Sequence, residues 1–183
     1  MTIDPALRDE MLAAVPSLRA FGISLCGNVD RADDLVQETL LRAFANIDSF
    51  TPGTNMGAWL FTILRNLFRS EYRKRRREVE DADGHYAETL TSQPEQHGHV
   101  EFQEFRNALS KLPDDQREAL ILVGASGYSY EETAQICGCA VGTIKSRVNR
   151  ARHRLAKLLT IDNPGDFGPD PVARAVYSRS DRA

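Results

Sequence analysis

The sequence predicts an all-α protein built of two small helical domains, and three observations point to that fold. Apolar residues recur every three or four positions through most of the 183-residue chain, the spacing of one helix face. No segment shows the alternation of apolar and polar residues that is typical of a strand. This helical spacing of apolar residues is lost over 78–100, between two stretches that show it. We therefore expect one domain over 7–77, a flexible acidic linker over 78–100, a second domain over 101–160 and a disordered tail over 161–183.

Three helices are expected in the first domain. The first covers 7–26 and contains Pro16, a residue type that kinks or breaks helices. Asp30 is a good N-cap for the second helix, whose apolar stripe runs to Phe44 and Ile47. A turn follows, and the third helix is expected over about 57–77.

The second domain is predicted to contain a helix-turn-helix motif. Two short helices, the second over 114–123, precede a third over 129–137 whose first residues fit a capping box. Gly138 then makes a tight turn, and a longer basic helix follows over about 141–159. In this motif the turn lets the second helix lie in the major groove of DNA while the first helix supports it.

The charge distribution favours nucleic-acid binding, although the net charge is only −3. Residues 65–77 and 141–160 each carry a net charge of +6, and residues 78–104 between them carry −8. No apolar run is long enough for a membrane span, and residues 1–10 lack the layout of a signal peptide. We therefore expect a cytoplasmic protein with no membrane association.

The polar face of the last predicted helix carries the strongest functional signal. Lys145, Ser146, Asn149 and Arg150 share this face, and Lys, Arg and Asn are side chains that read base edges. Arg147 points further round and suits DNA phosphates. The alternative is a solvated surface helix, but residues 141–160 hold no acid to form the ion pairs that stabilise such helices.

The third predicted helix carries a second signal, for single-stranded nucleic acid. Arg65, Arg69 and Arg73 follow the aromatic residues Phe50 and Trp59. Positive charge tracks a nucleic-acid backbone, and rings stack on bases. The alternative is that the aromatic residues of this helix belong to the core, which we expect for its two phenylalanines.

Metal binding and catalysis have little support. Cys137-x-Cys139 could pair with His85, His97 and His99, but the C-x-C spacing is poor for zinc and the histidines lie in the predicted linker. The sequence also contains no Ser/His/Asp, Cys/His or paired-carboxylate arrangement of the kind that an active site would need. We expect no metal, no cofactor and no enzymatic activity.

Four segments, taken in order, resemble the extracytoplasmic-function (ECF) sigma factors of bacterial RNA polymerase. DRADDLVQETLLRAF (30–44) is similar to the helix that binds core polymerase, and AWLFTILRN (58–66) to the helix that handles the −10 promoter element. LPDDQREAL (112–120) and VGTIKSRVNRAR (141–152) are similar to the domain that reads the −35 element. ISLCGN (23–28) and RNLFRSEYRKRRRE (65–78) look closest to the EcfG subgroup, which drives a general stress response.

The resemblance implies a sigma region 2 bundle, a sigma region 4 helix-turn-helix and a role for each polar surface. Asp34, Gln37 and Glu38, which alone would be read as a solvated face, match positions that face the clamp helices of the largest polymerase subunit. Phe50 and Asn66 match positions near the pocket for a flipped −10 base. The −10 surface as a whole is expected to comprise Phe50, Trp59, Arg65, Asn66, Arg69 and Arg73, and the −35 surface Lys145, Ser146, Arg147, Asn149 and Arg150.

The predicted function is therefore that of a sigma factor, which binds core RNA polymerase, recognises −35 and −10 DNA and promotes melting at −10. The subgroup resemblance implies a GGAAC-like −35 element, stress-response promoters and a small anti-sigma partner of the NepR type. Two alternatives stay open. One is a sigma-like decoy that binds an anti-sigma factor but no promoter, and the other is a stand-alone helix-turn-helix regulator.

Overall fold

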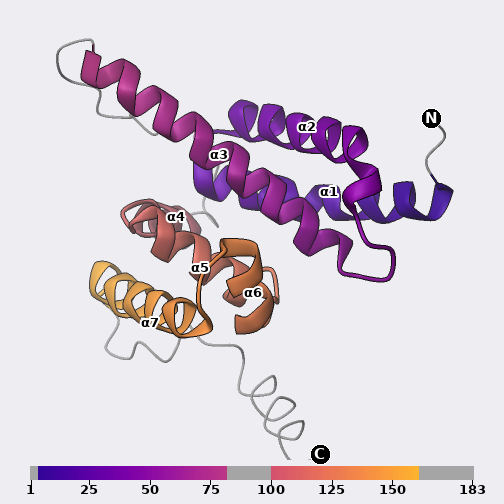
Figure 1. Ribbon diagram of the computed structural model, residues 1–183. Helices are drawn as coiled ribbons and strands as arrows, with labels where there is room; N and C mark the ends of the chain where they lie inside the picture. Colours follow the sequence, from indigo (N-terminus) through magenta and orange to yellow (C-terminus); the bar gives the residue numbers. More distant parts are fainter. Residues whose placement is uncertain (1–3, 82–99, 161–183) are drawn as a thin grey trace, which may run out of the picture.

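The computed structural model describes residues 4–81 and 100–160, and every regular element in these ranges is a helix. Three helices, α1 (Pro5–Cys26), α2 (Val29–Ala45) and α3 (Met56–Asp81), form the first group, with a 3₁₀ turn, η1 (Ile47–Ser49), before α3. Figure 1 shows α3 as a long rod that extends past the ends of α1 and α2. The all-α prediction is confirmed. No helix of the described ranges is long and apolar enough to cross a membrane.

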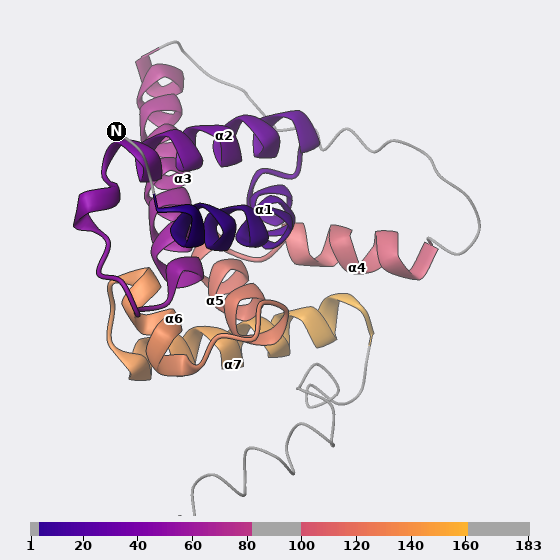
Figure 2. The ribbon, with the colours of Figure 1, turned by 90° about the vertical axis from the view of Figure 1, so that its right-hand side faces the viewer.

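The second group consists of α4 (Val100–Ser110), α5 (Asp114–Gly124), α6 (Tyr130–Cys137) and α7 (Val141–Leu158). Helices α5 and α7 pack closely together, and α6 lies between α3 and α7. In the turned view of Figure 2 this group lies directly beneath α1–α3 rather than apart from it. The predicted linker beyond Asp81 and the predicted tail lie outside the described residues.

The start of α2 differs from the prediction. Asn28, not Asp30, is the N-cap: its side-chain oxygen accepts a hydrogen bond from the backbone N–H of Arg31 at 2.9 Å. Asp30 lies inside the first turn, where its negative charge still complements the helix dipole. The preceding Gly27 adopts φ 67°, which ends α1 in a left-handed cap. Helix α1 continues through Pro16 without a break.

Helix α3 is longer than predicted at both ends. Asn55 caps its start, because its side-chain oxygen accepts from the backbone N–H of Ala58 at 3.0 Å. The helix continues four residues past Arg77, to Asp81, through glutamates that favour helix. Residues 78–81, predicted as linker, are therefore helical, since neither Gly nor Pro occurs there to stop the helix.

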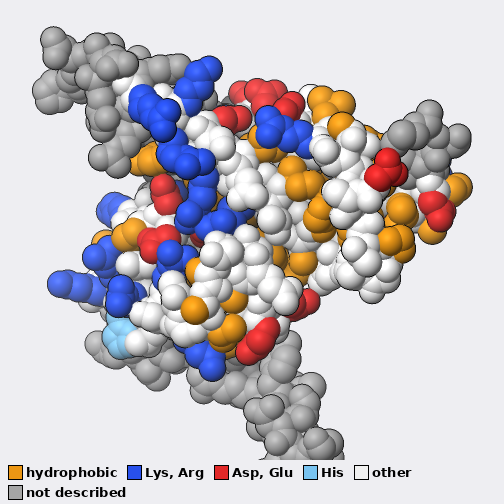
Figure 3. All heavy atoms as spheres, viewed as in Figure 1, with side chains coloured by type: hydrophobic (Ala, Val, Ile, Leu, Met, Phe, Trp, Pro, Cys, Tyr) orange, Lys and Arg blue, Asp and Glu red, His pale blue; other side chains and the backbone are white. Residues whose placement is uncertain are grey.

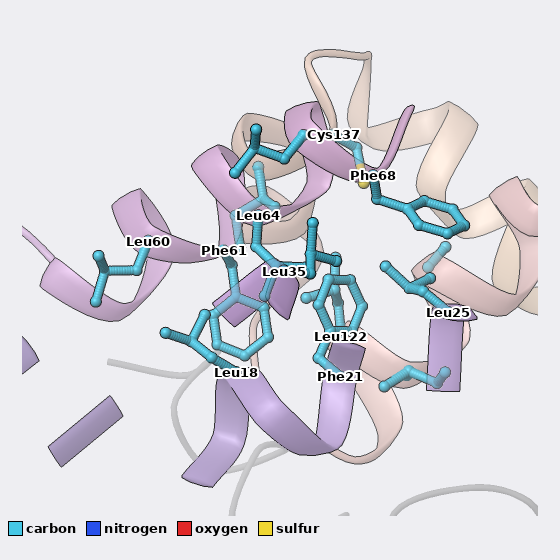
Figure 4. Close-up of a cluster of buried hydrophobic side chains, with 14 of the residues drawn as sticks. Leu18, Phe21, Leu25, Leu35, Leu60, Phe61, Leu64, Phe68, Leu122 and Cys137 are labelled. Carbon is cyan, nitrogen blue, oxygen red and sulfur yellow. The ribbon is translucent and has the colours of Figure 1, made fainter. Parts of the chain in front are cut away.

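One hydrophobic cluster joins the two helix groups. Its members include Phe21 of α1 and Phe61 of α3, both about 1% exposed, and Leu122 of α5, which is fully buried. Figure 4 shows these side chains with Cys137 of α6 in the same cluster. The ring centroids of Phe21 and Phe61 lie 5.0 Å apart. The apolar surface of the first group is thus buried partly against the second.

The tight turn of the helix-turn-helix depends on one glycine. Gly138 has φ 61°, where a residue with a Cβ atom is strained by about 1–2 kcal/mol. We expect Gly138→Ala to lower the free energy of unfolding by about that amount, measured by urea denaturation followed by circular dichroism. Gly142→Ala is the matched control, because a Cβ atom there meets nothing within 4 Å and φ is ordinary. Gly142→Ala should be more stable than the wild type by up to about 1 kcal/mol. Equal stability of Gly138→Ala and Gly142→Ala would contradict the role given to Gly138 in the turn.

Candidate nucleic-acid interface

Helices α6 and α7 form the predicted helix-turn-helix. The capping box is present: the Ser129 backbone N–H donates to Glu132 Oε2 at 2.9 Å, and the Glu132 N–H donates to Ser129 Oγ at 3.0 Å. The first of these bonds is the main reason why the pKa of Glu132 is lowered. Helix α7 begins at Val141 without a side-chain cap from Ala140. The turn therefore fixes the direction of α7 mainly through Gly138 and the packing beneath α7.

Four of the five predicted −35 residues line one face of α7. Lys145, Asn149 and Arg150 are exposed and Ser146 is partly buried. Arg147 lies differently, because its Nε atom pairs with Asp115 Oδ2 of α5 at 3.1 Å. In this structure Arg147 joins α7 to α5, and the other four residues form an open polar surface.

The three arginines predicted for −10 DNA lie along α3, and their exposure increases along the helix. Arg65 is 6% exposed and forms an ion pair with Glu118 of α5. The Nη2 atom of Arg69 donates to the other oxygen of Glu118 at 3.1 Å. Arg73 is exposed. Figure 3 shows Lys and Arg side chains in a stripe along α3 and in a second group near α7, with acidic side chains between them.

A pocket of about 560 Å³ lies between α3 and the start of α5. From α3 it is lined by Asn66, Arg69 and Arg73, and across from them lie Asp114 and Glu118. Pockets of this volume accommodate a small organic group. Arg65 lines it too, so the structure brings four predicted −10 residues to one pocket, whose opposite wall is acidic.

The two aromatic residues predicted for −10 DNA lie together at the other end of α3. The rings of Phe50 and Trp59 have centroids 5.2 Å apart, and Phe50 is 6% exposed. Phe61 and Phe68 are buried at 1% and 6%, which confirms that they belong to the core. Phe50 thus takes part in packing, and the exposed loop 51–55 lies next to it.

Helix α2 presents the three residues predicted to bind polymerase. Asp34 and Gln37 are exposed, and Glu38 pairs with Arg42 at 2.8 Å, one helical turn later. Phe44, a member of the apolar stripe predicted for this helix, is 38% exposed. It lies in the last turn of α2, which ends one residue later at Ala45.

Glu118 is the functional candidate that the sequence did not reveal. It is 3% exposed and lies between two arginines that are 53 and 49 positions away along the chain. On α5 it is surrounded by buried residues, so nothing in the local pattern marks it. Only the packing of α5 against α3 identifies its partners.

The described residues contain no group of three or more His, Cys, Asp and Glu side chains that could hold a metal ion. Burial, followed by the nearby Glu118 carboxylate, raises the pKa of the Cys137 thiol to about 12. Cys137 is thus a buried thiol near neutral pH. His85, His97 and His99 lie outside the described residues.

Comparison with protein families matches both halves of the chain. Residues 12–78 match the family described as sigma-70 region 2, and residues 102–155 match sigma-70, region 4. The first match covers most of α1, all of α2 and most of α3, and the second covers most of α4, all of α5 and α6, and most of α7. The basic stripe of α3 therefore lies in one matched region, and the polar face of α7 lies in the other.

Individual relatives extend the same finding over nearly the full chain. The chain is 76% identical over 176 residues to the ECF RNA polymerase sigma factor EcfG of Rhodopseudomonas palustris, covering 96% of this chain and 97% of the relative. It is 38% identical to the ECF sigma factor SigC of Mycobacterium tuberculosis over 73% of this chain and 72% of the relative. Among solved structures, the sigma factor RpoE of Bartonella quintana, crystallised with the anti-sigma factor NepR, aligns with a TM-score of 0.80. That alignment has 56% identity and covers 87% of this chain and all of the other.

Proposed function

This chain belongs to the ECF sigma factors of bacterial RNA polymerase, and from that premise we propose which of its surfaces performs each step of promoter recognition. The region 2 domain, predicted over 7–77 and built of α1–α3, binds polymerase and the −10 element. The region 4 domain, predicted over 101–160 and built of α4–α7, binds the −35 element. The family is not an enzyme class, and we propose that the chain has no catalytic activity of its own.

The observation that carries the proposal is the presence of two separate basic surfaces, one on each domain. The open face of α7 offers Lys145, Asn149 and Arg150 to base edges, with Ser146 beside them. Helix α3 offers arginines and the exposed Asn66 beside a pocket. Duplex recognition at one site and capture of unpaired bases at the other require these two kinds of surface.

The remaining partners follow from the resemblance and from the named relatives. Asp34, Gln37 and Glu38 on α2 are proposed to bind the clamp helices of the largest polymerase subunit. A small anti-sigma factor of the NepR type is the proposed inhibitor, because a relative with 56% identity was crystallised with NepR. Stress-response promoters and the cytoplasm are the proposed setting.

The two alternative functions lose most of their support. A decoy would not need the polar residues of α7 or the arginines of α3, and the relative with 76% identity is a sigma factor by name. A stand-alone regulator would leave the region 2 match over 12–78 without a role.

The test is run-off transcription with purified core polymerase. A promoter with a GGAAC-like −35 element should give a transcript only when this chain is added. The polymerase alone, and this chain with a promoter whose −35 and −10 elements are scrambled, are the controls. Absence of a promoter-specific transcript would overturn the proposal. A stand-alone regulator would instead bind promoter DNA strongly in a gel-shift assay without polymerase.

A further inference from the structure

Part of the α3 surface assigned to −10 DNA, the part around Arg65 and Arg69, is in contact with the region 4 domain of the same chain, while Asn66 and Arg73 are exposed. Arg65 and Glu118, 6% and 3% exposed, are both buried in the contact between α3 and α5. Arg69 binds the second oxygen of the same carboxylate at 3.1 Å. Arginines bind a carboxylate and a DNA phosphate through the same N–H donors, and here Glu118 accepts from both arginines.

A second set of contacts covers the start of α3. Asn55, in the exposed loop 51–55 next to Phe50, donates from Nδ2 to Glu132 of α6 at 3.1 Å. The ring of Tyr128 meets that of Phe61 edge to face, with centroids 5.2 Å apart. A Cβ atom added at Gly57 would lie 2.8 Å from the Tyr128 hydroxyl, so the two domains approach closely here.

A buried arginine of the region 4 domain completes the contact on the side of α1. Arg117 Nη2 donates to the carbonyl oxygen of Leu25 at 3.2 Å, and Arg117 also pairs with Asp114 at 2.6 Å. Beneath these polar contacts the core of both domains is one hydrophobic cluster. Apolar burial and ion pairs thus join the domains along the first half of α3, from Asn55 to Arg69.

This arrangement is incompatible with simultaneous binding of both promoter elements. Elements centred at −35 and −10 are about 25 base pairs apart, which is about 85 Å along B-DNA. The two domains here are within hydrogen-bond distance of each other. Helix α7, with 18 residues, is itself only about 27 Å long. The 18 residues from 82 to 99 allow the domains to separate by up to about 60 Å.

We propose that this structure is a self-inhibited state of the free chain, in which the region 4 domain occupies part of the −10 surface and Glu118 takes the place of a DNA phosphate between Arg65 and Arg69. Promoter recognition requires this contact to break. The inference rests on the proposed function, because it assumes that α3 binds −10 DNA. The inference gives Glu118 an inhibitory role in the free chain. A sigma factor could bind DNA through α3 without such a residue.

The test compares three variants of the full chain. Glu118→Gln keeps the shape of the side chain but leaves Arg65 without a counter-charge, a condition that is costly when buried and is relieved by opening. Tyr128→Ala removes an uncharged contact across the same interface. Glu131→Gln is the matched control, because it removes the same charge from an exposed position on α6.

Binding is measured with a labelled single-stranded oligonucleotide that carries the −10 segment of the promoter used for run-off transcription. We expect Glu118→Gln to bind at least about tenfold more tightly, equivalent to about 1.4 kcal/mol, and Tyr128→Ala to change affinity in the same direction. Both variants should show a larger radius of gyration by small-angle X-ray scattering. The control should change neither quantity.

Unchanged affinity and radius in both folded variants would overturn self-inhibition. If Glu118→Gln fails to fold by circular dichroism, Tyr128→Ala decides the question. Transcription by the wild-type chain with core polymerase separates the two proposals, since it tests the sigma function whatever the variants do. A wild-type chain that transcribes while both variants bind like wild type would overturn only the inference drawn here.

Discussion

Lys145→Ala combined with Arg150→Ala is expected to lower transcription from a promoter with a GGAAC-like −35 element by about 100-fold or more, because each bidentate base contact contributes about 1–3 kcal/mol. Both side chains are exposed on the open face of α7 and pair with no acid in the described structure. Their loss should therefore remove DNA contacts without affecting the fold. The measurement is run-off transcription with saturating core polymerase.

Two comparisons make this expectation specific to −35 recognition. A promoter with a scrambled −35 element should give the same low transcript level with the variant and with the wild type. Lys111→Ala combined with Lys157→Ala removes the same charge from exposed positions of the region 4 domain outside the polar face, and should retain most of the activity. Equal transcription by the two double variants would show that charge alone, and not the face of α7, determines recognition.

The helix-turn-helix could be predicted because its signals are local. Ser129 and Glu132 are three positions apart, Gly138 marks the turn, and the apolar spacing of the last helix shows which side is buried. A capping box and a left-handed glycine act within one helical turn, so the sequence carries their geometry directly. The same holds for the polar face of α7, four of whose five predicted residues lie together.

The relation between the two domains could not be predicted, because it depends on pairs far apart in the sequence. Arg65 belongs to a basic segment that predicts nucleic-acid binding, yet its partner in this structure is Glu118. Asp30 and Asn28 are both good caps, and only the geometry of the chain after Gly27 selects Asn28. Phe44 fits the apolar spacing of α2, but whether a neighbour covers it depends on how α1 and α3 pack. In each case the local pattern allows more than one outcome.

Replacing Asp34, Gln37 and Glu38 together with alanine is expected to weaken binding to core polymerase by about 100-fold or more, a loss of about 2.7 kcal/mol. Asp34 and Gln37 are exposed, and the one ion pair lost, between Glu38 and Arg42, lies on the surface and contributes only about 0.3–0.5 kcal/mol to stability. The variant should therefore fold normally, with an unchanged circular-dichroism melting curve. Affinity is measured by titrating labelled chain with core enzyme.

The matched control is Asp9→Ala combined with Glu10→Ala, which also removes two negative charges from exposed positions of the region 2 domain. It should bind core polymerase like the wild type. Because the triple variant keeps both DNA surfaces, a large excess of it should restore promoter-specific transcription, since mass action offsets a weaker affinity. Undiminished affinity would show that α2 does not carry the polymerase contact. Failure of excess chain to restore transcription would show that these residues act after binding, in the opening of the promoter.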